Sequence, residues 1–488
     1  MKSLIRFTLI ICAGLTCWML SAATSLQSWE TSVVSIEVTF KDYDSFQPWT
    51  TPTRSIRKHG LVIGTREILT TAQYLPTETL VRLQKGGRGP WYKARVVWLD
   101  PHADLALVTS EEPEFWKGLK SAELAKKVPP APDFNLLRWR DGNLESRRVE
   151  FSKFSVKDGT LSFAPRFTLE VNTELNGLGW AEPVTVDGKV AGLSTSKNGN
   201  TCNVVPSPFI RRILEAHKTG RYRGLGYFDF TWQSGENPTT LKYLGLQGPD
   251  RGVVVTKVPQ RPGMASVLKP RDILLEVDSF PIDTEGDYPD PDYGHLLLEN
   301  LSSRTRFAGD VVPMKVWRDG GILSVNYTLP EAKYHDELLP REVFDHPPEY
   351  VVAGGLVFQQ LDQPFLRGWG DDWRRRAPFR LQHYQNDAAT PERPSLVMLS
   401  SVLPDPFNVG YQELRMLVVD QINGRKISTL SDVVDALGQP KDGVHRVQFM
   451  RGENLQSLLL DAGSLEDATR RVLKRYGITQ DKRLETKK

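Results

Sequence analysis

The sequence Val33-Val34-Ser35-Ile36-Glu37-Val38-Thr39-Phe40 alternates apolar and polar side chains, which is the pattern of a half-buried β-strand. Gly60–Ile63 and Glu67–Thr71 follow as the two strands of a hairpin. Further short β-like runs cover residues 80–83, 94–99 and 104–109. Short strands in such a series predict an all-β barrel or sandwich, and we expect this β-rich region to continue to residue 208.

Composition places the chain among ordinary globular proteins. It has 488 residues, of which 40% are hydrophobic and 25% are charged. This length is enough for about three to four domains. The 33 prolines and 38 glycines favour turn-rich β architecture over helical bundles. The 62 Lys and Arg nearly balance the 59 Asp and Glu, so the charge gives no support for a nucleic-acid partner.

The first residues have the features of a secretory signal. Lys2 and Arg6 form a positive start, and the apolar run Phe7–Leu20 is too short to span a bilayer comfortably. Small residues at positions 21–23 provide a cleavage site after Ala23. We therefore expect an exported protein, periplasmic or otherwise extracytoplasmic. A retained membrane anchor is the alternative.

Cysteine usage is compatible with export. Cys12 and Cys17 lie in the predicted signal segment, and the residues before Cys17 make a poor lipoprotein box. The processed chain would keep only Cys202 and would therefore have no internal disulfide.

Three runs contain candidate chemistry. Ile68-Leu69-Thr70-Thr71-Ala72-Gln73 ends the second hairpin strand. Asp104 lies within Asp100-Pro101-His102-Ala103-Asp104-Leu105-Ala106-Leu107-Val108. Gly177-Leu178-Gly179-Trp180-Ala181-Glu182-Pro183-Val184 comes before the turn at Asp187-Gly188. In this order the runs resemble the HtrA/Deg family of trypsin-like serine proteases, whose motifs supply a His, an Asp and a Ser.

The resemblance implies that the catalytic triad is incomplete. Gln73 stands at the position of the His, and an amide cannot accept and return a proton near neutral pH. Asp104 matches the Asp that orients the His, while Trp180 falls at the position of the Ser. A one-residue shift would not restore the nucleophile, because no Ser, Thr or Cys occurs between Gly177 and Val184. Without a His partner, Asp104 is interpreted as a structural hydrogen-bond acceptor.

The loop that would hold the oxyanion is altered as well. Ala181 and Glu182 replace two glycines of the family motif, and glycine allows backbone conformations that a Cβ atom resists. The indole of Trp180 would fill space that a scissile peptide must occupy. The chain therefore resembles a protease that lacks the means to cleave.

Other side chains could in principle replace the missing groups. His59 and His102 are interpreted as surface histidines, because neither occupies a motif position. Ser194 and Ser196 are expected to be ordinary strand residues, and no base is specified for Cys202.

The resemblance also implies the fold, which is mainly β: a chymotrypsin-like double β-barrel followed by two PDZ domains. The second barrel is expected over residues 135–205, closed by a helix at Ile210–Lys218. The implied segments are a signal peptide, a degenerate trypsin-like domain, two PDZ domains and a charged tail, at residues 1–23, 24–220, 221–335, 336–470 and 471–488.

A peptide-binding loop is expected after the second barrel. Arg223-Gly224-Leu225-Gly226-Tyr227 resembles the carboxylate-binding loop of an HtrA-type PDZ domain, and the ordered run from Arg251 to Asp278 supports this resemblance. It implies that Gly224, Leu225, Gly226 and Tyr227 bind a peptide, whose strand pairs with a sheet edge while backbone N–H groups hold its carboxylate. The alternative is a PDZ fold whose groove is closed by neighbouring segments.

A second, weaker PDZ-like copy follows. Ala353–Phe358 stands at the carboxylate-loop position, Val397–Pro404 at the next strand and Val418–Ile427 at the following turn. A helix is expected at Leu430–Leu437. In relatives of this type the second domain mainly serves assembly, so we expect peptide binding less here than in the first domain.

The segment Asp283–Asp292 is rich in aspartate. Its spacing is not that of an EF-hand, and its prolines favour an extended, solvated surface loop. We therefore expect no metal and no other cofactor.

Together these features predict an exported HtrA/Deg-like pseudoprotease. It would bind C-termini or unfolded segments of proteins through its PDZ domains, as a chaperone-like adaptor or regulator. The alternative is an active serine endopeptidase in protein quality control, with a relocated base and nucleophile. The resemblance implies a trimer-based homo-oligomer, assembled through Trp29, Phe46 and Trp49, or a mixed oligomer with an active homologue.

Overall fold

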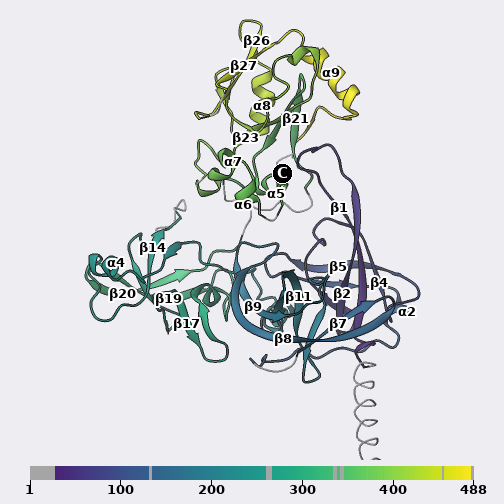
Figure 1. Ribbon diagram of the computed structural model, residues 1–488, viewed down its shortest axis with the longest axis vertical. Helices are drawn as coiled ribbons and strands as arrows, with labels where there is room; N and C mark the ends of the chain where they lie inside the picture. The colour runs from purple at the N-terminus through teal and green to yellow at the C-terminus, as the bar shows by residue number, and fades with distance from the viewer. Residues whose placement is uncertain are drawn as a thin grey trace, which may run out of the picture. The chain divides into compact units, whose positions relative to one another are not determined.

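The protein consists of two compact units in a computed structural model (Figure 1). The structure describes residues 28–130, 134–259, 266–332, 338–340, 346–370, 372–387, 389–452 and 455–484. The first unit comprises Met1–Phe40 with Ser55–Ala332, and the second comprises Lys41–Arg54 with Lys333–Lys488. The predicted signal segment, residues 1–23, lies outside the described residues. Among the residues that are described, no helix has the length and apolar character needed to span a bilayer.

The first six strands close into a barrel in the order β1-β2-β3-β6-β5-β4. Their bounds are Val33–Lys41 (β1), Thr53–Gly64 (β2), Glu67–Thr70 (β3), Glu78–Gln84 (β4), Tyr92–Asp100 (β5) and Leu105–Thr109 (β6). The alternation in β1 places Val34, Ile36 and Val38 in one buried cluster. The predicted hairpin is β2 with β3, in which Leu61 lies opposite Leu69.

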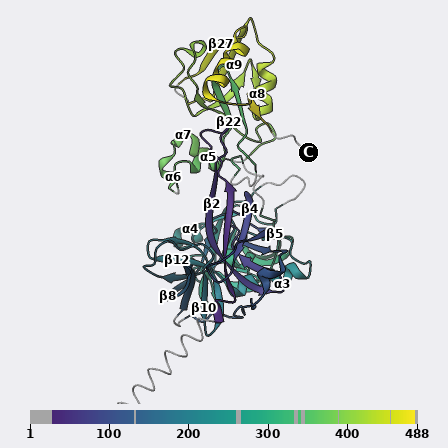
Figure 2. The same ribbon diagram turned by 90° about the vertical axis from the view of Figure 1, so that its right-hand side faces the viewer.

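The next six strands close into a second barrel in the order β10-β11-β12-β9-β8-β7. Figure 2 labels β8, β10 and β12 of this barrel. Their bounds are Phe134–Arg140 (β7), Asn143–Asp158 (β8), Pro165–Asn172 (β9), Pro183–Val186 (β10), Lys189–Asn198 (β11) and Thr201–Pro206 (β12). The short helix α2 (Pro113–Trp116) precedes this barrel, and α3 (Ser207–Lys218) follows it.

A shared core joins the two barrels. The apolar face of α3 buries Phe209 and Ile213 in a cluster that also contains Leu61 and Leu105 of the first barrel and Leu193 of the second. The predicted double barrel and its closing helix are therefore confirmed, and the seam between the barrels is well packed.

A separate sheet follows in the first unit, in the order β13-β14-β15-β19-β20, with β16 paired to β15 and a hairpin of β17 and β18. The strand bounds are Thr231–Gln233 (β13), Val253–Lys257 (β14), Ile273–Val277 (β15), Phe280–Pro281 (β16), Asp287–Asp290 (β17), Gly294–Leu297 (β18), Val311–Arg318 (β19) and Gly321–Thr328 (β20). The helices are α4 (Pro238–Tyr243) and η1 (Leu298–Ser302). Tyr293 packs 4.7 Å, between ring centroids, from Phe167 of the second barrel.

The second unit contains a larger sheet, in the order β27-β26-β24-β23-β22-β21-β28, with β25 paired to β24. The strand bounds are Tyr350–Ala353 (β21), Leu356–Gln360 (β22), Val397–Val402 (β23), Leu417–Ile422 (β24), Arg425–Lys426 (β25), Val444–Phe449 (β26), Ser457–Asp461 (β27) and Lys482–Arg483 (β28). The helices are α5 (Gln363–Arg367), α6 (Trp373–Arg376), α7 (Phe379–Gln382), η2 (His383–Asn386), η3 (Pro406–Asn408), α8 (Leu430–Leu437) and α9 (Leu465–Tyr476). The predicted helix at Leu430–Leu437 is α8, whose start is capped by Thr429.

The segment between β1 and β2 belongs to the second unit. Phe46 packs 5.1 Å from both Phe365 and Trp369, and Trp49 lies 6.1 Å from Tyr350, all between ring centroids. Both rings have partners within the chain, and the Phe46 side chain is still 39% exposed. The role of Phe46 and Trp49 in assembly stays a prediction. Trp29 is half-buried against the core shared by the barrels.

Candidate functional site

Asp104, which the motif resemblance places in the triad, is a buried residue with structural contacts. It immediately precedes β6, and its carboxylate accepts hydrogen bonds from Ala72 N at 3.0 Å and Arg166 Nη2 at 3.1 Å. Asp104 is 0% and Arg166 3% exposed, so the ion pair is withdrawn from water. Burial raises the pKa of Asp104, while Arg166 and Lys58 oppose that rise. The interpretation of Asp104 as a hydrogen-bond acceptor agrees with these contacts, but the sequence did not reveal Arg166.

Gln73 joins the two barrels through its amide. Its Nε2 donates to the carbonyl oxygen of Thr195, on β11, at 2.5 Å. Its own backbone carbonyl accepts from Lys58 Nζ at 3.1 Å. The side chain that the resemblance places at the His position therefore contributes one hydrogen bond across the seam of the barrels, and an amide does not act as an acid or base near neutral pH.

Lys58 is a buried amine that sequence reasoning missed. Its Nζ donates to the backbone oxygen and to Oγ1 of Thr71, at 2.7 and 2.8 Å. Burial lowers the pKa of Lys58 to about 7. A signal was present in the sequence, because Ile56, Lys58, Gly60 and Val62 share the phase of one strand face.

The loop before β10 closes on its own carboxylate. Oε2 of Glu182 accepts from Gly179 N at 3.0 Å, from Trp180 N at 2.8 Å and from Ser194 Oγ. Glu182 is 1% exposed, and its backbone N–H donates to Ser194 Oγ at 2.9 Å. Ala181 has a φ of 62°, a left-handed conformation that favours glycine. An internal carboxylate thus accepts from Trp180 N, which the motif resemblance places among the N–H groups that a protease would aim at a reacting oxyanion.

Trp180 covers the region beside Gln73. Its ring stacks on Tyr74, with centroids 5.8 Å apart and planes inclined by 29°. Its backbone oxygen accepts from His59 N at 2.8 Å. The indole is therefore fixed by contacts with the first barrel.

The interpretation of His59 and His102 as surface residues is wrong. Both are buried, at 9% and 8% exposure. His59 Nε2 accepts from Trp139 N at 2.9 Å, and His102 Nδ1 lies 3.0 Å from Ser162 Oγ. Burial lowers the pKa of both, that of His102 to about 4. Their imidazoles are neutral packing and hydrogen-bonding groups.

The serines and the cysteine near the loop are parts of strands. Ser194 and Ser196 lie on β11, and Ser196 Oγ accepts from Asn203 Nδ2 at 2.9 Å. Cys202 is a buried free thiol on β12, and burial raises its pKa to about 12. A thiol with such a pKa is a poor nucleophile.

The expected carboxylate-binding loop packs on the barrel pair. The carbonyl oxygens of Gly224, Leu225 and Gly226 accept from Ala308 N, Ala332 N and Ser302 Oγ, at 3.1, 3.1 and 3.2 Å respectively. Leu225 is 1% exposed within the core shared by the barrels, and Tyr227 meets Phe163 edge-on with 5.1 Å between centroids. The next strand, β13, is the terminal strand of its sheet among the described strands. The peptide-binding role of these residues stays a prediction.

In the second unit, the strand that follows the expected carboxylate loop is β22, and it is paired on both sides. Gly354 and Gly355, with φ of 58° and 93°, make the turn between β21 and β22. This turn pairs Val352 with Val357, while β23 lies on the other side of β22. Gly354 N donates to Thr469 Oγ1 at 2.8 Å. The edge to which a peptide strand would add is therefore occupied by β21.

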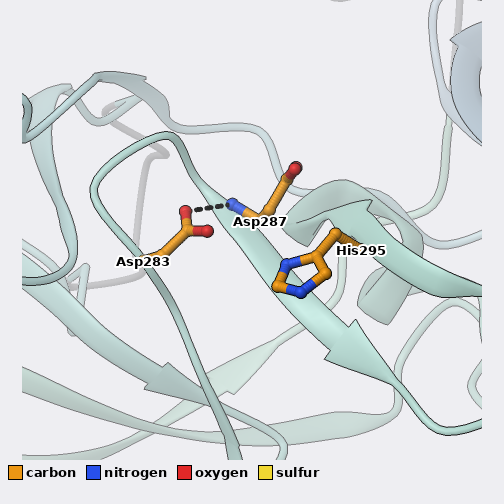
Figure 3. Close-up of side chains that lie close together, drawn as sticks. All are labelled: Asp283, Asp287 and His295. Carbon is orange, nitrogen blue, oxygen red and sulfur yellow. Dashed lines mark hydrogen bonds between the residues drawn. The ribbon is translucent and has the colours of Figure 1, made fainter.

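Two carboxylates of the aspartate-rich segment, those of Asp283 and Asp287, lie close to His295 of β18 (Figure 3). One ligand atom from each of Asp283, Asp287 and His295 lies within 4.8 Å of the others. Asp283 Oδ1 accepts from Asp287 N at 2.8 Å. Burial and Asp283 raise the pKa of Asp287, and His295 opposes that rise. This donor set suits a divalent cation; the sequence interpretation considered the aspartates without His295.

Comparisons with known proteins agree with this architecture. A family model described as a PDZ domain matches residues 339–483, which include the copy that seemed weaker in the sequence. The mitochondrial Do-like 11 protein of Arabidopsis thaliana is 25% identical and covers 92% of this chain and 74% of its own length. The chloroplastic protease Do-like 2 of the same plant is 23% identical, covering 92% of this chain and 74% of its own length.

The HtrA-type protease AlgW with decapeptide has a TM-score of 0.48 and 15% identity, and the match covers 63% of this chain and 98% of that one.

Proposed function

We propose that this chain, a member of the HtrA/Deg family, is an exported pseudoprotease that binds polypeptides instead of cleaving them. Its partners are C-termini or unfolded segments of proteins, and its role is that of a chaperone-like adaptor or a regulator of an active homologue. Export rests on the predicted signal at residues 1–23.

The observation on which this proposal rests is the position of Glu182. Acyl transfer needs backbone N–H groups that are free to stabilise a developing oxyanion. Here the N–H groups of Gly179 and Trp180 donate to Glu182 Oε2, at 3.0 and 2.8 Å. A substrate oxyanion would have to displace a carboxylate that is 1% exposed. The amide of Gln73 and the indole of Trp180 support the same conclusion, because neither can serve as base or nucleophile.

Peptide binding is proposed for the first PDZ region. Its strand β13 is terminal among the described strands of the sheet, and a terminal strand presents backbone groups to which an extended peptide can add. In the second PDZ region, β21 pairs with β22. We therefore assign peptide capture to the first region and assembly to the second.

A second candidate function, an active endopeptidase in protein quality control, rests on Lys58. An amine whose pKa is about 7, with a hydroxyl 2.8 Å away on Thr71, has the elements of a base and a nucleophile. However, Lys58 is 1% and Thr71 0% exposed. A peptide bond cannot reach buried atoms, so we favour the binding function.

Two assays separate these candidates. The purified chain is incubated with unfolded β-casein, and separately with a serine- and threonine-reactive fluorophosphonate probe. We expect neither cleavage nor labelling. Cleavage that disappears in a Thr71→Val variant would replace our proposal with the endopeptidase.

The binding function is tested with peptides that differ only at the C-terminus. Fluorescence anisotropy should detect binding of a free carboxylate and much weaker binding of the matched amide. Gly224→Val should weaken binding, because Gly224 has a φ of 87°. Gly245→Val is the matched control: Gly245 has a φ of 75° with no neighbour within 4 Å of a built Cβ, and follows α4. Equal loss in both variants would contradict the assignment.

A further inference from the structure

A polar cavity lies between the two barrels, beside the closed loop. Its volume is about 260 Å³. β2 of the first barrel contributes Arg57 and His59, and β7 of the second contributes Arg138 and Arg140. The loop before β10 contributes Trp180 and Glu182. Ser35 of β1 and Gln84 of β4 also line it, so the cavity is built from several elements of both barrels within one compact unit.

Positive charge is concentrated at this cavity. Its lining includes three arginines and Lys58, against the carboxylates of Asp141 and Glu182. The chain as a whole is almost neutral, with 62 Lys and Arg against 59 Asp and Glu. A cavity with an excess of cationic side chains concentrates anions from solution.

Two of the arginines keep their capacity to donate. Arg57 Nε lies 3.5 Å from a Glu37 oxygen, and the Arg57 side chain is 73% exposed. Arg140 Nε lies 3.7 Å from Asp141, with side-chain exposures of 61% and 91%. Such long, exposed ion pairs contribute little to stability. Both guanidinium groups can therefore turn to a ligand at small cost.

The remaining groups shape the cavity and do not compete for an anion. Arg138 is held by Glu145 at 3.0 Å and by the backbone oxygen of Asn176 at 3.1 Å. The ammonium of Lys58 is directed to Thr71 and Gln73.

The histidine and the lining glutamate are also engaged. His59 Nε2 accepts from the Trp139 backbone. Glu182 uses Oε2 for three hydrogen bonds within its loop and strand.

We propose that this cavity binds carboxylate side chains of an acidic polypeptide segment. Guanidinium groups match carboxylates in paired, planar hydrogen bonds. A volume of about 260 Å³ is below that of typical drug-sized pockets and suits one or two acidic side chains. The ring of Trp180 provides an apolar wall for their stems. The proposal rests on the proposed function in that the ligand is a polypeptide, but it concerns the barrels and not the PDZ regions.

The test uses a probe that cannot engage a PDZ carboxylate loop. Calorimetric titration of the full chain with C-terminally amidated hexaglutamate should show binding, and amidated hexaglutamine should show none. The variant Arg57→Gln/Arg140→Gln should weaken hexaglutamate binding by about tenfold or more, since each charge-assisted hydrogen bond is strong.

A matched control separates a site from general charge attraction. Arg66→Gln/Arg95→Gln removes the same charge from two exposed arginines of the first barrel, both of which pair with Glu111. This variant should bind hexaglutamate as the unaltered chain does. Equal weakening in both double variants, or no binding by the unaltered chain, would overturn the proposal. Neither outcome bears on binding of free C-termini, so the proposed function is tested separately.

Discussion

The strands of the two barrels and the residues at their ends illustrate different constraints. Both barrels are closed, and their cores are made of apolar side chains. At the strand ends lie Gln73, Asp104 and Trp180, the residues that the motif resemblance assigns to the catalytic positions, and each is bonded or stacked within the chain. The barrels depend on many apolar contacts, whereas catalysis depends on a few polar groups being free. When these polar groups are bonded within the chain, they stabilise the fold and are not available to a substrate.

If these groups are now structural, removing an internal partner of one of them should lower stability as much as removing a core residue does. The largest effect is expected for Arg166→Met. It removes the guanidinium that forms the ion pair with Asp104, which is 0% exposed. An unpaired buried charge lowers the free energy of unfolding by about 3–5 kcal/mol. Leu69→Ala, at a fully buried core position, should cost a similar amount, about 2–5 kcal/mol.

The pH dependence of the Arg166→Met effect identifies its cause. Because burial raises the pKa of Asp104, acidification should protonate the unpaired carboxyl and reduce the loss. The double variant Asp104→Asn/Arg166→Met should recover most of the stability, since Asn still accepts from Ala72 N. Denaturant titrations followed by tryptophan fluorescence measure all three variants. A loss that persists at low pH and in the double variant would mean that Arg166 acts through packing alone.

A smaller effect is expected for Glu182→Ala. The substitution removes the acceptor of Gly179 N, Trp180 N and Ser194 Oγ. Donors that lose a buried acceptor cost about 1–3 kcal/mol in total when water can enter from the neighbouring cavity. Glu182→Gln keeps an acceptor oxygen and should cost less. If both variants melt as the unaltered chain does, the loop is not held by this carboxylate.

The barrels could be predicted from the sequence because their signals are local. The alternation in Val33–Phe40 and the hairpin at Gly60–Thr71 lie within short stretches, and the hydrophobic phase sets which side chains face the core.

The internal partners of the remnant could not be predicted in the same way. Asp104 and Arg166 are 62 residues apart, and Gln73 and Thr195 are 122 apart. No period connects residues at such separations. The motifs predicted which side chains would be exchanged, and only the fold shows which partners these side chains have.

The buried imidazole of His102 provides a third test, in which the free energy of unfolding is measured against pH. Burial lowers the pKa of His102 from 6.5 to about 4, so the folded state keeps the imidazole neutral while the unfolded chain takes up a proton. Its contribution to stability is complete above pH 6.5 and should be lost as pH falls towards 4, by about 1.4 kcal/mol per pH unit. His102→Gln should remove this slope. An unchanged slope in the variant would assign the acid sensitivity to other groups.

The smallest effect, on proteolytic activity, is expected from introducing the His and Ser of the family motifs. Gln73→His together with Trp180→Ser supplies the residue types of a base and a nucleophile. Yet Glu182 would still hold the loop N–H groups, and Asp104 would still be paired with Arg166. We therefore expect no labelling by a fluorophosphonate probe and no cleavage of β-casein.

This negative result becomes informative through a second variant. Adding Glu182→Gly to the restored pair frees the loop N–H groups, and oxyanion donors account for about 10²–10³-fold in rate in serine proteases. Labelling that appears only after Glu182 is changed would show that this carboxylate is what closes the site. Labelling of the restored pair with Glu182 in place would show instead that the frame still tolerates catalysis. The chain would then differ from an active protease at only two side chains, Gln73 and Trp180. The internal hydrogen bonds of Glu182 and Asp104 would not be what prevents catalysis.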